Sequence, residues 1–218
     1  VRGGKGNAWF KSSTRQSPRY AQPGITGEEL WVWFRLKLIA DAGLIGLPNA
    51  GKSTLLSVVS AARPKIASYP FTTLYPGLGV AEIDNHEFII ADIPGLIKGA
   101  HLGSGLGTRF LGHIERCKVL LHLVDCCDED PVDSWKTIQN EIKEYGSDLN
   151  EKKCITVLTK SDALLDELNI EIEQKLKKAG AKEVYRISSI SNQGVSNLLR
   201  KVSETIINID KSNSDLED

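Results

Sequence analysis

The chain has 218 residues, of which 41% are hydrophobic and 25% are charged, and its formal net charge is −1. This balance indicates one ordinary globular domain with a small additional segment, and it argues against a protein that coats nucleic acids through net positive charge. No uninterrupted apolar run approaches the roughly 18 residues of a membrane span, so none is expected. Because the sequence contains no methionine, we expect it to be a piece of a longer protein.

Residues 1–27 form a basic, glycine-rich segment with no acidic residue before Glu28. Its composition disfavours a helix and predicts extended or looped backbone. A basic arm can contact phosphates, although a solvated segment explains the charge equally well. Apolar residues then alternate in "ELWVWFRLKLIA" (Glu29–Ala40), which predicts a strand whose aromatic side chains pack in a core or a domain interface.

From Ala42 onward, strand and helix patterns alternate. Strands are predicted to end at Gly43–Gly46 and to cover Leu78–Ile83, Glu87–Ala91, Lys118–Val124, Cys154–Thr159 and Val184–Ser188. Helices are predicted over Ser53–Ala61, Trp135–Tyr145, Asn169–Ala179 and Val195–Ile206. This order predicts an α/β fold with a mainly parallel, doubly wound sheet and helices on both faces. The acidic residues 209–218 are expected to be disordered.

The four cysteines show neither the spacing of a metal site nor that of a disulfide framework. We expect free thiols, with Cys117 and Cys154 buried. Free thiols indicate a reducing, cytoplasmic environment.

The stretch "GLPNAGKS" has the glycine, four residues, Gly-Lys-Ser pattern of a phosphate-binding loop. Such a loop points its amides at phosphate oxygens, and the following helix adds the positive end of its dipole. We expect Lys52 to reach the terminal phosphates and Ser53 to bind Mg2+. The loop residues expected to contact nucleotide are Gly46, Leu47, Pro48, Asn49, Ala50, Gly51, Lys52 and Ser53. The loop alone fits a kinase, an ATPase or a GTPase.

Two further motifs extend this phosphate site. In "EFIIADIPG", Asp92 ends an apolar strand and can hold Mg2+ through its water shell, while the Gly95 amide can contact the last phosphate. In "YPFTTLYPG", Thr73 can bind Mg2+ only when the third phosphate is present, which would make this loop a switch. The expected contacts in these motifs are Phe71, Thr72, Thr73, Asp92, Ile93, Pro94 and Gly95.

The stretch "TKSD" (Thr159–Asp162) follows a buried strand and decides the base. The Asp162 carboxylate can accept two hydrogen bonds from guanine, whereas adenine lacks that pair of donors. GTP is therefore favoured over ATP. The residues expected around the base are Thr159, Lys160, Ser161, Asp162, Ser188, Ser189 and Ile190.

In this order the motifs resemble those of translation-factor-type small GTPases. "GLPNAGKSTLL", "YPFTTLYPGLG", "DIPGLIKGAHLGSGLGTRFLGHIERC" and "GGKGNAWFKSSTRQSPRYAQPG" are similar to Obg family sequences, and the resemblance covers residues 1 to about 208. It implies that 1–40 are the end of a glycine-rich Obg domain, that 41–208 are a P-loop GTPase domain, and that 209–218 are a tail. It further implies a role in large ribosomal subunit maturation and in growth or stress control. The expected partners of this cytoplasmic monomer are guanine nucleotides and the large ribosomal subunit or its precursor, with its RNA and proteins.

The chain departs from the Obg pattern at Thr159, where relatives carry asparagine. Threonine lacks the amide that would bond the base and brace the phosphate loop, so weaker base affinity is expected. A second departure concerns catalysis: Leu96 occupies the position where many GTPases have a glutamine that orients water. Hydrolysis should therefore be slow without help.

Asn49 is the candidate helper. In related GTPases that lack the glutamine, an asparagine at this position helps hold K+ beside the phosphates, and such an ion replaces an arginine finger. The alternative for Asn49 is that it only braces the loop.

The catalytic set is thus Lys52, Thr73, Gly95 and Asn49. Of the histidines, His101 is a candidate base, His113 is expected to have a surface or packing role, and His122 is expected to be a core residue. Two alternatives remain open: a nucleotide-sensing module with negligible turnover, and a P-loop ATPase or kinase.

Overall fold

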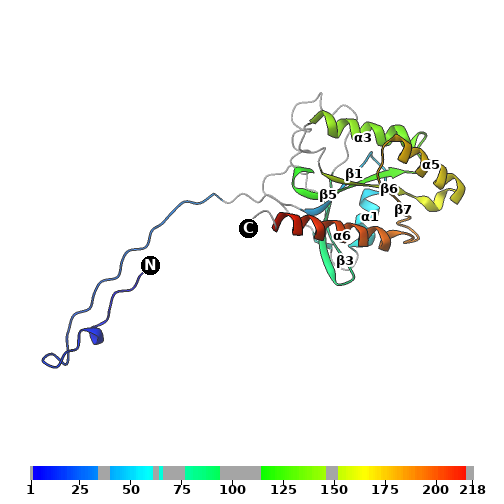
Figure 1. The fold of residues 1–218 in the computed structure, drawn as a ribbon. Coiled ribbons are helices and arrows are strands. Elements are labelled where there is room, and N and C mark those ends of the chain that lie inside the picture. The colour runs from blue at the N-terminus through cyan, green and yellow to red at the C-terminus, as the bar shows by residue number, and fades with distance from the viewer. Residues whose placement is uncertain are drawn as a thin grey trace. The chain divides into compact units, whose positions relative to one another are not determined.

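The computed structural model describes residues 2–33, 40–60, 64–65, 77–93, 114–145 and 152–214 (Figure 1). The chain divides into two compact units, Val1–Leu36 and Lys37–Asp218. Within the described residues, no helix combines the length and the apolar character that crossing a membrane requires.

The first unit has little regular structure. It contains one short 3-10 helix, η1 (Asn7–Phe10), and an antiparallel bridge that joins Arg2 to Ile25. The predicted strand at Glu29–Ala40 is wrong over Glu29–Trp33, which is not a strand and in which Trp31 and Trp33 are exposed, whereas Ala40 does lie in a strand. Alternating side chains alone do not make a strand: the backbone groups also need a paired neighbour, and none is described here.

The second unit is built on a seven-stranded sheet with the strand order β2-β3-β4-β1-β5-β6-β7. Strands β1 and β4 to β7 pair in parallel, whereas β2–β3 and β3–β4 pair antiparallel, the latter across the turn at Asp84 and Asn85. The strands are β1 Ala40–Ile45, β2 Pro64–Lys65, β3 Gly77–Ile83, β4 His86–Asp92, β5 Cys117–Asp125, β6 Lys153–Thr159 and β7 Val184–Arg186.

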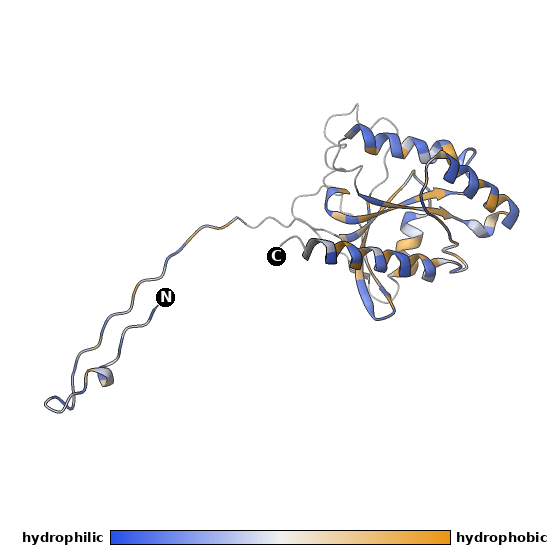
Figure 2. Ribbon diagram, viewed as in Figure 1, coloured by the Kyte–Doolittle hydropathy of each residue, from blue (hydrophilic) through white to orange (hydrophobic). Residues whose placement is uncertain are grey.

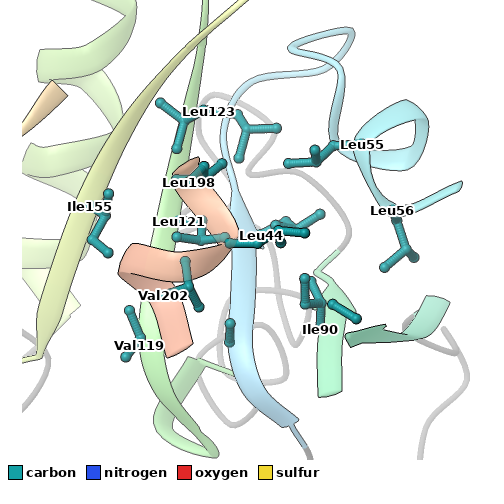
Figure 3. Close-up of a cluster of buried hydrophobic side chains, with 14 of the residues drawn as sticks. Leu44, Leu55, Leu56, Ile90, Val119, Leu121, Leu123, Ile155, Leu198 and Val202 are labelled. Atoms are coloured by element: carbon teal, nitrogen blue, oxygen red, sulfur yellow. The ribbon is translucent and has the colours of Figure 1, made fainter. Parts of the chain in front are cut away.

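Helices cover both faces of the sheet, as predicted. On one face, α1 and α6 pack against the strands through a cluster that includes Leu44, Leu55 and Leu198 (Figure 3). On the other face, α3 and α5 cover the strands with Ile138, Trp135 and Leu176. Hydrophilic and hydrophobic residues alternate along each helix, whereas the central strands are largely hydrophobic (Figure 2). The helices are α1 Lys52–Val59, α3 Pro131–Tyr145, α5 Asp166–Ala179 and α6 Val195–Ser214, with a 3-10 turn η3 at Ser161–Ala163.

The C-terminal helix is longer than predicted. Disorder was expected from residue 209, but α6 continues to Ser214. Ile209 packs against the core, and the Asp210 carboxylate lies 2.7 Å from the Lys118 ammonium. An apolar contact and an ion pair therefore help to hold the last helical turns to the domain.

The parallel strands place their carboxyl ends at one edge of the sheet. Strands β1, β4, β5 and β6 end there at Ile45, Asp92, Asp125 and Thr159. In open α/β sheets, ligands bind outside this edge, and every predicted motif that the structure describes follows one of its strands.

Candidate functional site

The phosphate-binding loop runs from β1 into α1 and depends on its glycines. Gly46 has a φ of 148°, and a Cβ atom there would lie 2.4 Å from the carbonyl oxygen of Leu123. Gly51 has a φ of 88° directly before the first turn of α1. A side chain at either position would be strained. This curl brings the loop to the N-terminus of α1, where anions bind favourably.

Lys52 lies buried beneath the loop. Its ammonium donates hydrogen bonds to the carbonyl oxygens of Gly46 at 3.0 Å and of Leu47 at 2.9 Å. Burial lowers the pKa of Lys52, while the nearby Asp92 carboxylate works against this shift. A cation held in this way favours an incoming phosphate, because the phosphate would offset its desolvation.

Ser53 and Asp92 meet across the sheet edge. The Ser53 hydroxyl donates a hydrogen bond of 2.6 Å to the Asp92 carboxylate. Hydroxyl and carboxylate oxygens are the hard donors that suit Mg2+. Two such groups side by side fit the predicted ion, with Ser53 as a ligand and Asp92 acting through the ion's water shell.

Thr159 contacts the phosphate-binding loop, which corrects one expectation. Its buried hydroxyl lies 2.9 Å from the carbonyl oxygen of Ala50 and 3.1 Å from that of Val124. Threonine was expected to leave the loop without a brace. The Thr159 hydroxyl at the end of β6 is close enough to donate a hydrogen bond to the loop backbone. This contact supports the loop without the amide that asparagine would supply.

The rest of the "TKSD" segment turns sharply after β6. Lys160 has a left-handed backbone, with a φ of 58°, and its ammonium forms an ion pair with Asp125 at the end of β5. The backbone of Ser161 is fixed on both sides: its amide donates to Ile187, and its carbonyl accepts from the buried Asn169 side chain at 2.9 Å. Asp162 is exposed.

Residues 188–190 lie beside this segment through that Ser161–Ile187 hydrogen bond. Ser188 is buried, and its hydroxyl accepts from the amide of Ser191 at 3.1 Å, whereas Ile190 is 84% exposed. The structure thus brings together three of the predicted groups: the phosphate-binding loop with Asp92, the segment 159–162, and the turn 188–190.

The model of the 50S ribosome-binding GTPase family matches residues 41–160, which hold the loop, Asp92 and the start of "TKSD". The chain belongs to this GTPase family. A GTP1/OBG model matches residues 1–38, and a model described as ethanolamine utilisation – propanediol utilisation matches residues 123–204. Together these matches support an Obg-type P-loop GTPase, and they do not favour the ATPase alternative.

Solved structures show the same fold. The GTPase is 25% identical to a single-residue variant of Aquifex aeolicus Era bound to GDP.AlF4-, with a TM-score of 0.60 over 78% of this chain and 57% of that one. It is 20% identical to the G domain of the T. maritima FeoB iron transporter, with a TM-score of 0.58 over 75% of this chain and 96% of that one. Era in complex with MgGDPNP and nucleotides 1506–1542 of 16S ribosomal RNA has a TM-score of 0.60 at 24% identity, covering 78% and 57%. The chain therefore spans nearly all of a G domain, but little more than half of each Era chain.

Several predicted site residues of this GTPase lie outside the described residues. They are Phe71, Thr72, Thr73, Pro94, Gly95 and Leu96, together with His101 and His113. Ile93 is described, and its side chain is fully buried. His122 is buried as expected: it stacks on Trp135, and its Nδ1 lies 3.1 Å from the Gln139 amide nitrogen.

Asn49 lies beside a cavity of about 350 Å³ between the loop and the end of β5. Its side chain is exposed, its φ is 66°, and it forms no side-chain hydrogen bond within the described part of the chain. Asp125 lines the same cavity.

Two residues of this edge were missed by the sequence analysis. Asp125, which pairs with Lys160, follows a buried strand directly, as Asp92 and Thr159 do, and that position was the available signal. Asn169, which holds Ser161, is a polar residue on the inner face of an otherwise amphipathic helix, and its burial to 2% exposure was not readable from the pattern.

Proposed function

We propose that this chain binds GTP with Mg2+ and hydrolyses it to GDP and phosphate, as a slow switch in large ribosomal subunit assembly and in growth and stress control. The observation that carries the proposal is the contact between the phosphate-binding loop and the "TKSD" segment at Ala50 and Thr159. It supports the proposal, because the loop proposed to cradle the phosphates and the segment proposed to read guanine are joined by a hydrogen bond, and one nucleotide would have to contact both.

In this proposal the loop 46–53 cradles the phosphates with its amides, and Lys52 leaves the carbonyls of Gly46 and Leu47 to pair with them. Ser53 and Asp92 hold Mg2+, which supplies charge neutralisation at the phosphates. Thr73 and Gly95 are proposed to sense the third phosphate from the two switch loops.

Base selection is assigned to the other side of the site. The exposed Asp162 carboxylate would accept hydrogen bonds from the guanine N1 and amino groups. Lys160 would lie beside the base, and the backbone amides of 188–190 would lie near the guanine carbonyl. Phe71, Thr72, Ile93 and Pro94 complete the proposed contacts.

Slow turnover is proposed because Leu96 has no polar group to orient water. Asn49 is the proposed K+ ligand, and its exposed position at the phosphate-binding loop supports that role. The competing function is a nucleotide sensor with negligible turnover. Single-turnover hydrolysis with and without ribosomal particles separates the two, since a switch should accelerate with particles and a sensor should not.

The ribosomal role rests on the family description, a 50S ribosome-binding GTPase. Co-sedimentation with large subunits, in a non-hydrolysable GTP analogue against GDP, tests it. Binding favoured by the analogue is expected, and equal or no binding in both nucleotides would reject the role.

Residues 1–40 are proposed as the end of an Obg domain, which the GTP1/OBG match and the unit boundary after Leu36 support. A monomer in the cytoplasm is proposed, and the four free cysteines agree with a reducing compartment.

Guanine specificity is tested by Asp162→Asn, with Asp166→Asn as a control at an exposed carboxylate four residues away. The change should weaken GTP binding by a factor of about 100 and improve xanthosine triphosphate binding, because the amide restores a complementary donor. Unchanged preference for GTP over ATP and xanthosine triphosphate would reject the guanine assignment.

A further inference from the structure

Two adjacent cysteines extend the end of β5 beside the proposed base site. The sulfur atoms of Cys126 and Cys127 lie 3.7 Å apart, and both are free thiols. Together with a carboxylate oxygen of Asp125, their sulfur atoms form a cluster in which all ligand atoms lie within 4.8 Å of one another. The sequence spacing indicated no metal site, because the usual patterns separate their cysteines by two or more residues.

The distance between the two sulfur atoms matches that of a tetrahedral thiolate site. With Zn–S bonds of about 2.3 Å, two sulfur ligands of one tetrahedral ion lie about 3.8 Å apart. The observed sulfur separation already has this value, so coordination needs no rearrangement of the two cysteines relative to each other. Asp125 provides a third ligand, and a solvent molecule can take the fourth position.

The cluster is accessible from one side. Cys127 is exposed, and with Asp125 it lines the cavity of about 350 Å³ described above. Cys126 is buried, and its thiol donates a hydrogen bond of 3.0 Å to the carbonyl oxygen of Lys160. An ion entering from the cavity would meet Cys127 and Asp125 first and then reach Cys126.

We propose that Asp125, Cys126 and Cys127 form a binding site for a soft divalent metal ion of the Zn2+ class, and that its occupancy weakens guanine-nucleotide binding. The ion replaces the proton of each thiol, and both protons pass to solvent. The effect on nucleotide rests on the proposed function, whereas metal binding itself does not.

The coupling passes through Lys160. This residue contacts the cluster twice, because its ammonium pairs with one oxygen of Asp125 and its carbonyl accepts from Cys126. The other Asp125 oxygen accepts from the Cys127 amide at 2.9 Å. Metal binding takes the Asp125 carboxylate and removes the Cys126 proton, so it breaks both contacts with Lys160. The segment that reads the base then loses two of its supports.

Metal binding is tested by titrating Co2+ into the reduced protein and recording its absorption. Wild type should develop thiolate charge-transfer bands and the visible bands of tetrahedral Co2+, saturating at one ion per chain. Cys127→Ser should lose these bands, and Cys154→Ser, a control at a half-buried thiol of β6, should keep them. Absence of the bands in wild type, or equal bands in Cys127→Ser, would overturn the site.

Coupling is tested by measuring the Kd of fluorescent GDP with and without Zn2+. Wild type should bind about tenfold more weakly with Zn2+, as expected for losing one charge-assisted contact. Cys127→Ser should bind equally in both conditions, which also controls for Zn2+ held by the nucleotide. Cobalt bands without any effect of Zn2+ on the Kd would overturn the coupling. Failure to bind GDP even without metal would reject the proposed function, while the Co2+ titration would still decide the metal site.

Discussion

The hydroxyl of Thr159 lies 2.9 Å from the carbonyl oxygen of Ala50, across 109 positions of sequence. This contact connects the end of β6 to the phosphate-binding loop, so the proposed base reader and the phosphate cradle share one buried hydrogen bond. Thr159 therefore has a structural role of its own.

Replacing Thr159 by valine keeps its shape and removes the hydroxyl. We expect the variant to bind GDP roughly tenfold more weakly, because a buried hydrogen bond worth about 1 to 1.5 kcal/mol is lost beneath the loop. Equilibrium titration with fluorescent GDP measures the effect. Thr159→Ser keeps the hydroxyl and should stay within about twofold of wild type. Wild-type affinity in Thr159→Val would mean that the hydroxyl does not support nucleotide binding.

Removing the charge of Asp92 should abolish the benefit of Mg2+. In wild type the affinity for GTP is expected to rise about tenfold or more when Mg2+ is added. The reason is that contacts with a charged group such as the Asp92 carboxylate contribute more binding free energy than contacts with a neutral group. In Asp92→Asn this ratio should approach one. Asp84→Asn, in the turn before β4 where Asp84 pairs with Arg200, serves as control and should keep the wild-type ratio. A strong Mg2+ effect in Asp92→Asn would remove Asp92 from the ion site.

Asn49 makes the cation dependence of turnover testable. We expect wild type to hydrolyse GTP about tenfold faster in K+ than in Na+, because an ion beside the phosphates offsets developing charge. Asn49→Ala should turn over slowly in both salts. Equal rates in all four combinations would mean that Asn49 has no role in holding a cation.

Burial explains which parts of the fold were predictable. The runs ending at Val124 and Thr159 are almost continuously apolar, and the structure places both in the interior of a parallel sheet. The alternation of side chains at Glu29–Trp33 led to a wrong strand prediction, because the pattern describes side chains only, while a strand also needs hydrogen-bonding partners for its backbone. The last turns of α6 were missed for a similar reason, since their support from Lys118 is distant in sequence.

The site was predictable as a set of residue types but not as a set of contacts. Glycine, lysine and serine at fixed spacing identify a phosphate-binding loop wherever its neighbours lie. The hydrogen bond from Thr159 to Ala50, and the two contacts of Lys160 with the end of β5, depend on the register of β5 against β6, where Asp125 faces Thr159. Sequence spacing carries no information about that register.

His122 should make the stability of the domain depend on pH. Burial, together with the nearby positive charge of Lys52, lowers the pKa of His122 from 6.5 to about 3. The Gln139 amide nitrogen, 3.1 Å from Nδ1, fits a neutral ring that accepts there. Between pH 6.5 and 3 the unfolded chain binds a proton at this position and the folded chain does not, so stability falls as the pH falls. The free energy of unfolding should therefore fall by about 2 kcal/mol between pH 7 and pH 5.

Urea unfolding at the two pH values measures this loss, and His122→Gln should reduce the difference by that amount. His86→Gln, at an exposed histidine of β4, is the control and should leave it unchanged. An equal pH dependence in wild type and His122→Gln would mean that other groups cause it.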